Sequence, residues 1–190
     1  GVIEPGISLV KTGEGTQILR GLSTFTGDVT IAQGSLDVID IGDQGMAGNL
    51  GAGTTIILGS DGHNGTLKAD TAAARSVNRN IVLAAGGSGT IENSDYMDIS
   101  GVISGEGDLI KKGLNAGAHN GGRRLSLSGA NTYTGDTYIV EGVIQAAASG
   151  TLPDTTNVHI SGGAGNGRLR LVYHDQTING LFGDGIVQSY

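Results

Sequence analysis

The chain has 190 residues, 36 of them glycine, no cysteine and a formal net charge of −7. The absence of cysteine excludes a disulfide framework and thiolate chemistry, and the acidic balance disfavours nucleic acid and anionic membranes as partners. Glycine is far above its usual ~7% share, which favours a chain with many tight turns or closely stacked backbones.

The first part of the chain recurs in the second part. Leu9–Gly13 recurs as Leu109–Gly113, and Gly21–Val38 recurs as Gly129–Ala146, so the spacing grows from 100 to 108 residues through an insertion of eight. Such repetition predicts a stacked architecture and argues against a single catalytic centre. We interpret the chain as one continuous segment of two repeat units, 1–100 and 101–190, cut from a longer protein.

Short runs of alternating apolar and polar residues predict strands. Val29 and Ile31 alternate with polar neighbours, and Ile139 stands in the place of Ile31 in the second unit. A period of two is typical of a half-buried strand, so we expect Ile31 and Ile139 to point into the core. The only helical pattern, over residues 72–77, predicts one turn at most.

Polar residues followed by glycine separate these runs. Such pairs supply the positive φ that tight turns require. They are Gln33-Gly34, Asn64-Gly65, Glu141-Gly142, Asn166-Gly167 and Asn179-Gly180.

Three all-β folds compete: a sandwich, a closed barrel and a parallel β-helix. Sandwich cores rely on large aromatics, which form only 4% of this chain. The long repeat, the small turns and the aliphatic alternation favour a parallel β-helix, or solenoid. One coil of three short strands needs roughly 20–25 residues.

The repeated motif also carries a family resemblance. Leu109–Gly113, followed by Leu125–Thr137 and Glu141–Gln145, resembles the autotransporter-associated β-strand repeat, and His174–Leu181 is similar to the segment between such repeats. The resemblance implies a right-handed parallel β-helix from the passenger of a Gram-negative autotransporter, exported and displayed or released at the cell surface. It implies no particular activity.

Acidic residues are the main candidates for chemistry. Asp28 and Asp136 each end a Thr-Gly-Asp sequence and could serve a polysaccharide lyase or hydrolase, but their recurrence favours a turn-capping role. Asp37, Asp40 and Asp43 are spaced by three without the order of a calcium loop. The four histidines show no metal spacing. We therefore assign no catalytic, cofactor-binding or metal-binding residues.

The insertion Asn115–Gly122 is the candidate for partner binding. It is polar, breaks the repeat and leads into two arginines. Loops on a rigid scaffold often carry specificity, and the alternative is a neutral surface insertion. The candidate residues are Asn115, His119, Asn120, Arg123 and Arg124.

These observations predict a non-enzymatic structural or adhesive passenger segment, located outside the cell or on the bacterial surface. The expected partner is a host-cell surface protein or extracellular matrix, with no cofactor and no membrane contact by this segment. The alternatives are a β-helical polysaccharide-degrading enzyme and a secreted toxin or host-signalling effector.

Overall fold

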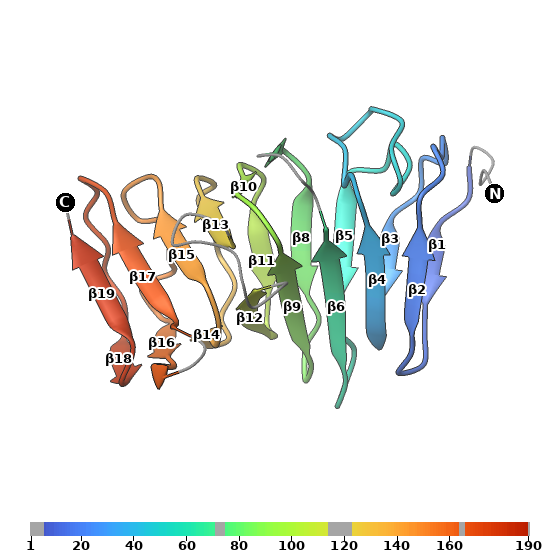
Figure 1. Ribbon diagram of the computed structural model, residues 1–190. Coiled ribbons are helices and arrows are strands. Elements are labelled where there is room, and N and C mark those ends of the chain that lie inside the picture. The colour runs from blue at the N-terminus through green and yellow to red at the C-terminus, as the bar shows by residue number, and fades with distance from the viewer. Residues whose placement is uncertain (1–5, 71–74, 114–122, 164–165, 190) are drawn as a thin grey trace.

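The computed structural model describes residues 6–70, 75–113, 123–163 and 166–189. Its strands form three parallel sheets, which are the faces of a β-solenoid of about seven stacked turns (Figure 1). Ile81 pairs with Ile56 and with Ile103, so one coil takes 25 residues and the next takes 22. The predicted all-β solenoid is confirmed; the predicted coil length holds for these two coils but not for the longer one in which Leu36 pairs with Leu67.

Each coil visits three faces in the same order. The first face holds β1 (Leu9–Lys11), β3 (Val29–Ile31), β5 (Thr55–Leu58), β8 (Asn80–Leu83) and β11 (Ile103–Gly105). The second face holds β2 (Thr16–Leu19), β4 (Gly34–Val38), β6 (Asn64–Ala69), β9 (Ser88–Asn93), β12 (Asp108–Gly113), β14 (Thr137–Ile139), β16 (Asn157–Ile160) and β18 (Gly180–Gly183). The third face holds β7 (Arg75–Val77), β10 (Met97–Ile99), β13 (Arg124–Leu127), β15 (Val143–Ala146), β17 (Arg168–Leu171) and β19 (Ile186–Ser189).

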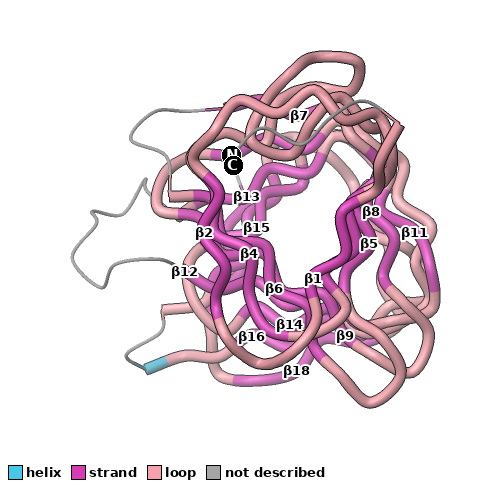
Figure 2. The backbone as a smooth tube through the Cα atoms, turned by 90° about the vertical axis from the view of Figure 1, so that its right-hand side faces the viewer, coloured by secondary structure: helices cyan, strands magenta, loops and turns pink. Residues whose placement is uncertain are grey.

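The coil is right-handed. Seen from the N-terminal end, the chain passes clockwise from the first face to the second and the third as it recedes (Figure 2). This is the hand that nearly all parallel crossovers adopt, because it follows from the right-handed twist of the strands.

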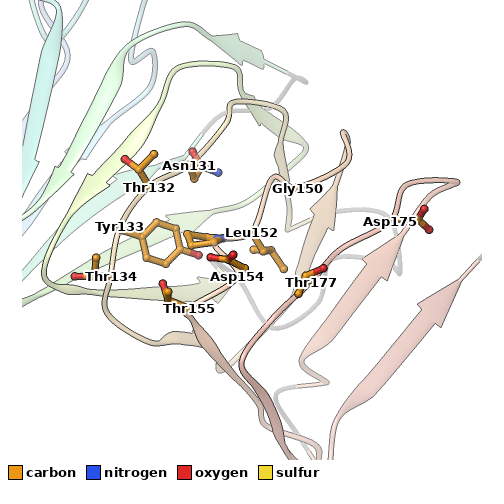
Figure 3. A pocket seen from close by; sticks show the side chains of 11 residues that line it. Asn131, Thr132, Tyr133, Thr134, Gly150, Leu152, Asp154, Thr155, Asp175 and Thr177 are labelled. Carbon is orange, nitrogen blue, oxygen red and sulfur yellow. The ribbon is translucent and has the colours of Figure 1, made fainter.

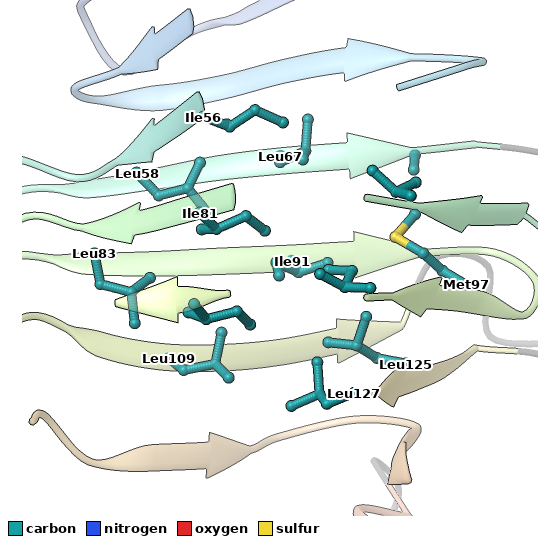
Figure 4. Close-up of a cluster of buried hydrophobic side chains, with 14 of the residues drawn as sticks. Ile56, Leu58, Leu67, Ile81, Leu83, Ile91, Met97, Leu109, Leu125 and Leu127 are labelled. Carbon is teal, nitrogen blue, oxygen red and sulfur yellow. The ribbon is translucent and has the colours of Figure 1, made fainter. Parts of the chain in front are cut away.

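The core is a set of aliphatic columns that run along the solenoid axis. Inward residues of neighbouring strands lie in register, as Leu67 and Ile91 do, and aliphatic side chains fill the space between the faces (Figure 4). Ile31 and Ile139 are fully buried, as the alternation predicts. Burial of each such side chain contributes roughly 1.5–3 kcal/mol, so the stack itself is the main source of stability.

A lysine interrupts one of these columns. Lys111 lies in register between Ile91 and Ile139 and is fully buried. Its Nζ donates to the backbone carbonyls of Lys112 and, at 3.5 Å, Glu141. Burial lowers the pKa of Lys111 to about 7, although the carboxylate of Glu141 opposes that shift.

Lys11 plays the same part in the first copy. Its Nζ donates to the carbonyls of Thr12 (2.8 Å) and Gln33 (3.1 Å), which are the counterparts of the two acceptors in the second copy. Lys11 and Lys111, here called the corner lysines, therefore satisfy carbonyls where the chain turns from one face to the next.

The predicted turns are confirmed in part. Gly34 and Gly142 have φ of 72° and 85°, and at the third site Asn166 itself has a φ of 46°. The other two predictions are wrong, because Asn64-Gly65 begins β6 and Asn179-Gly180 leads into β18. Gly65 is needed there for close approach, since a Cβ would collide with a backbone carbonyl of the preceding coil.

The predicted helical turn is also wrong over the part that the structure describes. Arg75–Val77 is strand β7, and Val77 pairs with Ile99 of the next coil; residues 72–74 lie outside the described ranges. Stacking against a neighbouring coil overrides the weak local preference of the sequence. Within the described ranges, the structure has no helix with the length and apolar character needed to cross a membrane.

Candidate functional site

The first face has no further strand after β11 within the described ranges. Among the described residues its place is taken by three segments without strands, 129–135, 147–156 and 172–179, which side chains help to join. Asn131 Oδ1 accepts from the backbone N–H of Ile103 (2.8 Å), and its Nδ2 donates to the carbonyl of Thr151 (2.8 Å). Thr151 Oγ1 in turn donates to the carbonyl of Gly129 (2.7 Å). A cleft of about 560 Å³ opens along these segments (Figure 3).

A buried chain of hydroxyls fixes the floor of this cleft. Tyr133 Oη lies 2.6 Å from Thr137 Oγ1, which lies 3.0 Å from Thr156 Oγ1. Thr156 Oγ1 also donates to the carbonyl of Gly135 at 3.0 Å. Burial raises the pKa of Tyr133 to about 12, so its phenol is neutral at physiological pH. Because the hydroxyl groups satisfy one another, the floor is held in one arrangement.

A β-turn places two polar side chains on the rim. The backbone N–H of Thr156 donates to the carbonyl of Pro153 (3.1 Å), which puts Asp154 and Thr155 at the two central positions of the turn. Pro153 and Asp154 are residue types that favour such turns. Asp154 therefore stands at the cleft on a turn whose base is tied to the floor through Thr156.

The polar rim is available to a ligand. It consists of six exposed side chains, none of which hydrogen-bonds to another described residue, and no described lining residue is basic. The rim can therefore accept and donate hydrogen bonds, but it offers an anion no opposite charge. The six side chains are Thr132, Thr134, Asp154, Thr155, Asp175 and Thr177.

A second cleft of about 480 Å³ adjoins the first and shares Asp175 with it. Tyr173 on its edge is 84% exposed and has a φ of 56°. A positive φ is uncommon for a bulky residue and is tolerated mainly where surrounding structure imposes it. An exposed tyrosine beside two joined clefts gives this side of the solenoid a large apolar group for contact with a partner.

Of the predicted binding residues, only Arg123 and Arg124 lie within the described ranges. Asn115, His119 and Asn120 fall outside the described residues, in the part of the sequence between β12 and β13. Arg123 forms an ion pair with Glu141. The guanidinium of Arg124 lies 4.3 Å above the ring of Tyr96. Both arginines therefore contact the body of the solenoid, and neither lines the cleft.

Asp28 and Asp136 do not converge. Asp28 precedes β3 on the first face, whereas Asp136 precedes β14 on the second. The Asp136 carboxylate contacts Asn157 Nδ2 (3.0 Å) and His159 Nε2 (3.2 Å) of the next coil, so it joins coils instead of capping its own turn. Burial would raise the pKa of Asp136, but hydrogen bonds from His159 and Asn157 lower it below its ordinary value.

The three aspartates with calcium-like spacing have separate partners. Asp37 pairs with Arg20 at 2.9 Å, and Asp40 and Asp43 each accept a hydrogen bond from a backbone N–H, at 3.1 and 3.0 Å. The loop after β4 is organised instead by the buried guanidinium of Arg79, which donates to four backbone carbonyls. The described residues contain no group of three acidic, histidine or cysteine side chains that could hold a metal ion.

The cleft was not predicted from the sequence. The Pro153-Asp154 pair is a local turn signal that could have drawn attention to the rim. Tyr173 has no such signal in the local sequence. Nothing in the local sequence indicates that the first face loses its strands after β11.

Comparison with known proteins points to a surface-exposed class. A family described as passenger-associated-transport-repeat matches residues 9–38 and 120–146. The adhesin BmaC autotransporter of Brucella suis biovar 1 (strain 1330) is 34% identical over 155 residues, which cover 81% of this chain and 4% of that protein. The chain thus spans a small part of that relative. No solved structure matches it.

Proposed function

Because this chain belongs to the autotransporter passenger domains that carry passenger-associated transport repeats, and is therefore surface-displayed or extracellular, we propose that it is an adhesive segment. It binds a host-cell surface protein or extracellular matrix and catalyses no reaction. The relationship to an autotransporter adhesin supports this function.

The observation that carries the proposal is the cleft. A rigid floor of satisfied hydroxyl groups supports six exposed polar side chains that have no partner among the described residues. Preorganised polar groups on a rigid scaffold bind with little loss of conformational entropy. The inserted residues Asn115–Gly122 are a second proposed contact, and the two arginines that follow them in the sequence, Arg123 and Arg124, contact the body of the solenoid.

The cleft has acidic residues but lacks the arrangement expected of a hydrolase. Asp154 and Asp175 both lie on the exposed rim, on consecutive coils. Glycoside hydrolysis requires a pair of carboxyl groups on either side of the scissile bond, one of them in an apolar pocket. An exposed rim does not provide that setting, which favours binding over cleavage.

The test is saturable binding of the purified segment to host cells and to matrix proteins. We expect saturation, a loss of binding on Asp154→Asn or on deletion of residues 115–122, and unchanged binding of an Asp28→Asn control. Binding that does not saturate, or that all three variants retain, would contradict an adhesive role for these surfaces. Release of new reducing ends from polysaccharides would contradict the non-enzymatic assignment.

A further inference from the structure

We propose that the cleft binds a neutral oligosaccharide, such as an uncharged glycan on a host glycoprotein. This inference rests on the adhesive function proposed above and specifies the chemistry of the ligand. It follows from the kind of polar groups on the rim, their spacing along the solenoid and the apolar surface beneath them.

The hydrogen-bonding groups of the rim complement sugar hydroxyls. The four threonine hydroxyls of the rim each donate and accept, while Asp154 and Asp175 only accept. Each sugar hydroxyl can likewise donate to a carboxylate and accept from a threonine. Sialylated, sulfated or phosphorylated ligands would bring negative charge to a rim that has carboxylates and, among its described lining residues, no cation.

The spacing of the rim groups is also suitable. They come in pairs from three consecutive coils: Thr132 with Thr134, Asp154 with Thr155, and Asp175 with Thr177. Neighbouring coils of a parallel solenoid lie about 4.8 Å apart, close to the length of one pyranose unit. A short glycan lying along the axis would therefore meet a new pair of polar groups at each sugar.

The floor provides a surface for the other side of a sugar. Leu152 and Pro153 line the cleft together with Tyr133 (Figure 3 labels Leu152 and Tyr133). Sugar rings have apolar C–H faces that pack on such surfaces, while their hydroxyls point to the rim. The volume of about 560 Å³ lies within the ~300–1,000 Å³ range of ligand sites.

A lysine or arginine of a basic peptide is the competing ligand. A cationic group would satisfy Asp154 and Asp175, but it would leave most threonine hydroxyls of the rim without a partner. The excess of hydroxyls over carboxylates therefore favours the glycan.

The experiment is calorimetric titration of the whole 190-residue protein with three sets of probes. The sets are neutral oligosaccharides of galactose, glucose, mannose and N-acetylated hexosamines, their sialylated or sulfated forms, and a peptide rich in lysine and arginine. We expect a neutral oligosaccharide to bind with little dependence on salt. The double variant Asp154→Asn/Thr177→Val should weaken it about tenfold or more, because two hydrogen bonds are lost or reduced.

The matched control is Thr26→Val/Asp28→Asn, which changes the same residue types at exposed positions of the first copy, away from the cleft. It should bind as the unaltered protein does, and both variants should keep the same melting temperature. Equal weakening in the two variants, or preference for the charged glycans or the basic peptide, would overturn the proposal.

Failure of this proposal is distinguishable from failure of the proposed function. If no glycan binds while the protein still binds host cells saturably, the ligand class is wrong and the adhesive function stands. If the protein binds neither glycans nor cells nor matrix, the adhesive function itself is wrong.

Discussion

The two copies of the repeat make the same strand pairs on different faces of the solenoid. In the first copy β1 pairs with β3 on the first face, with Leu9 opposite Val29 and Lys11 opposite Ile31. In the second copy β12 pairs with β14 in the same register, but on the second face. The next pairs, β2 with β4 and β13 with β15, are displaced from the second face to the third in the same way.

The displacement arises because the repeat spacing is not a whole number of coils. Strand β12 of the second copy lies on the second face, four coils after β2. Its counterpart in the first copy is β1, which lies on the first face, just before β2 in the chain. The repeat therefore specifies two stacked strand pairs and the corner between them, but no particular face. The division into units 1–100 and 101–190 remains a prediction from the sequence.

The corner lysine is the clearest element that the two copies share. Both lysines donate to the carbonyl of the following residue and to a carbonyl of the next coil. Their burial differs: Lys111 is fully buried between two coils, whereas Lys11 is half-buried at the N-terminal end of the described structure. The same pattern of lysine hydrogen bonds therefore occurs in two environments, and mutations can show how burial changes its effect on stability.

The largest expected effect is that of a charge in the core. Ile31→Asp should lower the free energy of unfolding by about 4 kcal/mol or more, because it buries a carboxylate with little compensation. Ile139→Asp should cost at least ~1 kcal/mol less, because the Lys111 amine on the neighbouring strand can hold a proton opposite the new carboxylate. Urea unfolding at pH 7 measures both values.

A double variant tests the reason for that difference. Adding Lys111→Met to Ile139→Asp should restore the full cost, since the cation is removed. The outward substitution Thr30→Asp serves as the control and should change stability by no more than ~0.5 kcal/mol. Equal costs for Ile31→Asp and Ile139→Asp would mean that Lys111 does not compensate the new charge.

The next largest effect is the pH dependence contributed by Lys111. Its pKa is about 7 in the folded protein and near the ordinary 10.5 when unfolded. Between these values the unfolded chain holds a proton that the folded chain lacks, so stability rises with pH by up to about 1.4 kcal/mol per unit. Urea unfolding from pH 7 to 10 should show this slope. It should vanish in Lys111→Met and remain in Lys11→Met; a slope that persists in Lys111→Met would have another source.

The alternation of apolar and polar residues along single strands correctly predicted which side chains face the core. The alternation around Ile31 and Ile139 identified two fully buried residues, because side-chain direction in a strand follows a period of two. The position of Lys111 in the core was not predicted, since lysine is rarely fully buried without partners. Its partners are backbone carbonyls, which any sequence would supply.

The cleft could not be predicted for a different reason. It depends on which segments of successive coils fail to form a ladder, and therefore on contacts such as Asn131 with Thr151 and Thr137 with Thr156, residues about 20 apart in the sequence. The sequence shows these residues but not their pairing. The candidate residues Asn115, His119 and Asn120 remain a prediction.

A smaller effect is expected from deleting the inserted loop. Removal of residues 115–122 restores the spacing of the first copy, where Thr12–Gly15 joins β1 to β2. Changes in loop length of this size alter closure entropy by only about 1 kcal/mol, so the melting temperature should stay within about 4 °C. Scanning calorimetry would measure it. Loss of the cooperative transition would mean that the two copies do not share a corner geometry.

The smallest effect separates two aspartates that the sequence makes equivalent. Asp136 accepts hydrogen bonds from Asn157 and His159, while no side-chain hydrogen bond of the exposed Asp28 occurs within the described ranges. The His159 ring also stacks between Tyr138 and Phe182, with centroids 4.6 and 5.0 Å away, which holds it in place for Asp136.

Asp136→Asn should therefore cost up to about 1 kcal/mol at pH 7, discounted for solvent screening, and Asp28→Asn should cost nothing measurable. The pKa of Asp136 is lowered by folding, so its contribution is present at neutral pH and disappears as the pH falls through the folded value. Urea unfolding of both variants at pH 7 and at about pH 3, below the unfolded Asp pKa of ~3.9, should show the difference shrinking in acid. A cost for Asp28→Asn equal to that of Asp136→Asn would contradict this account. It would show that the repeated aspartate acts within its own turn, where the two copies are alike, and that the contact with the next coil adds little.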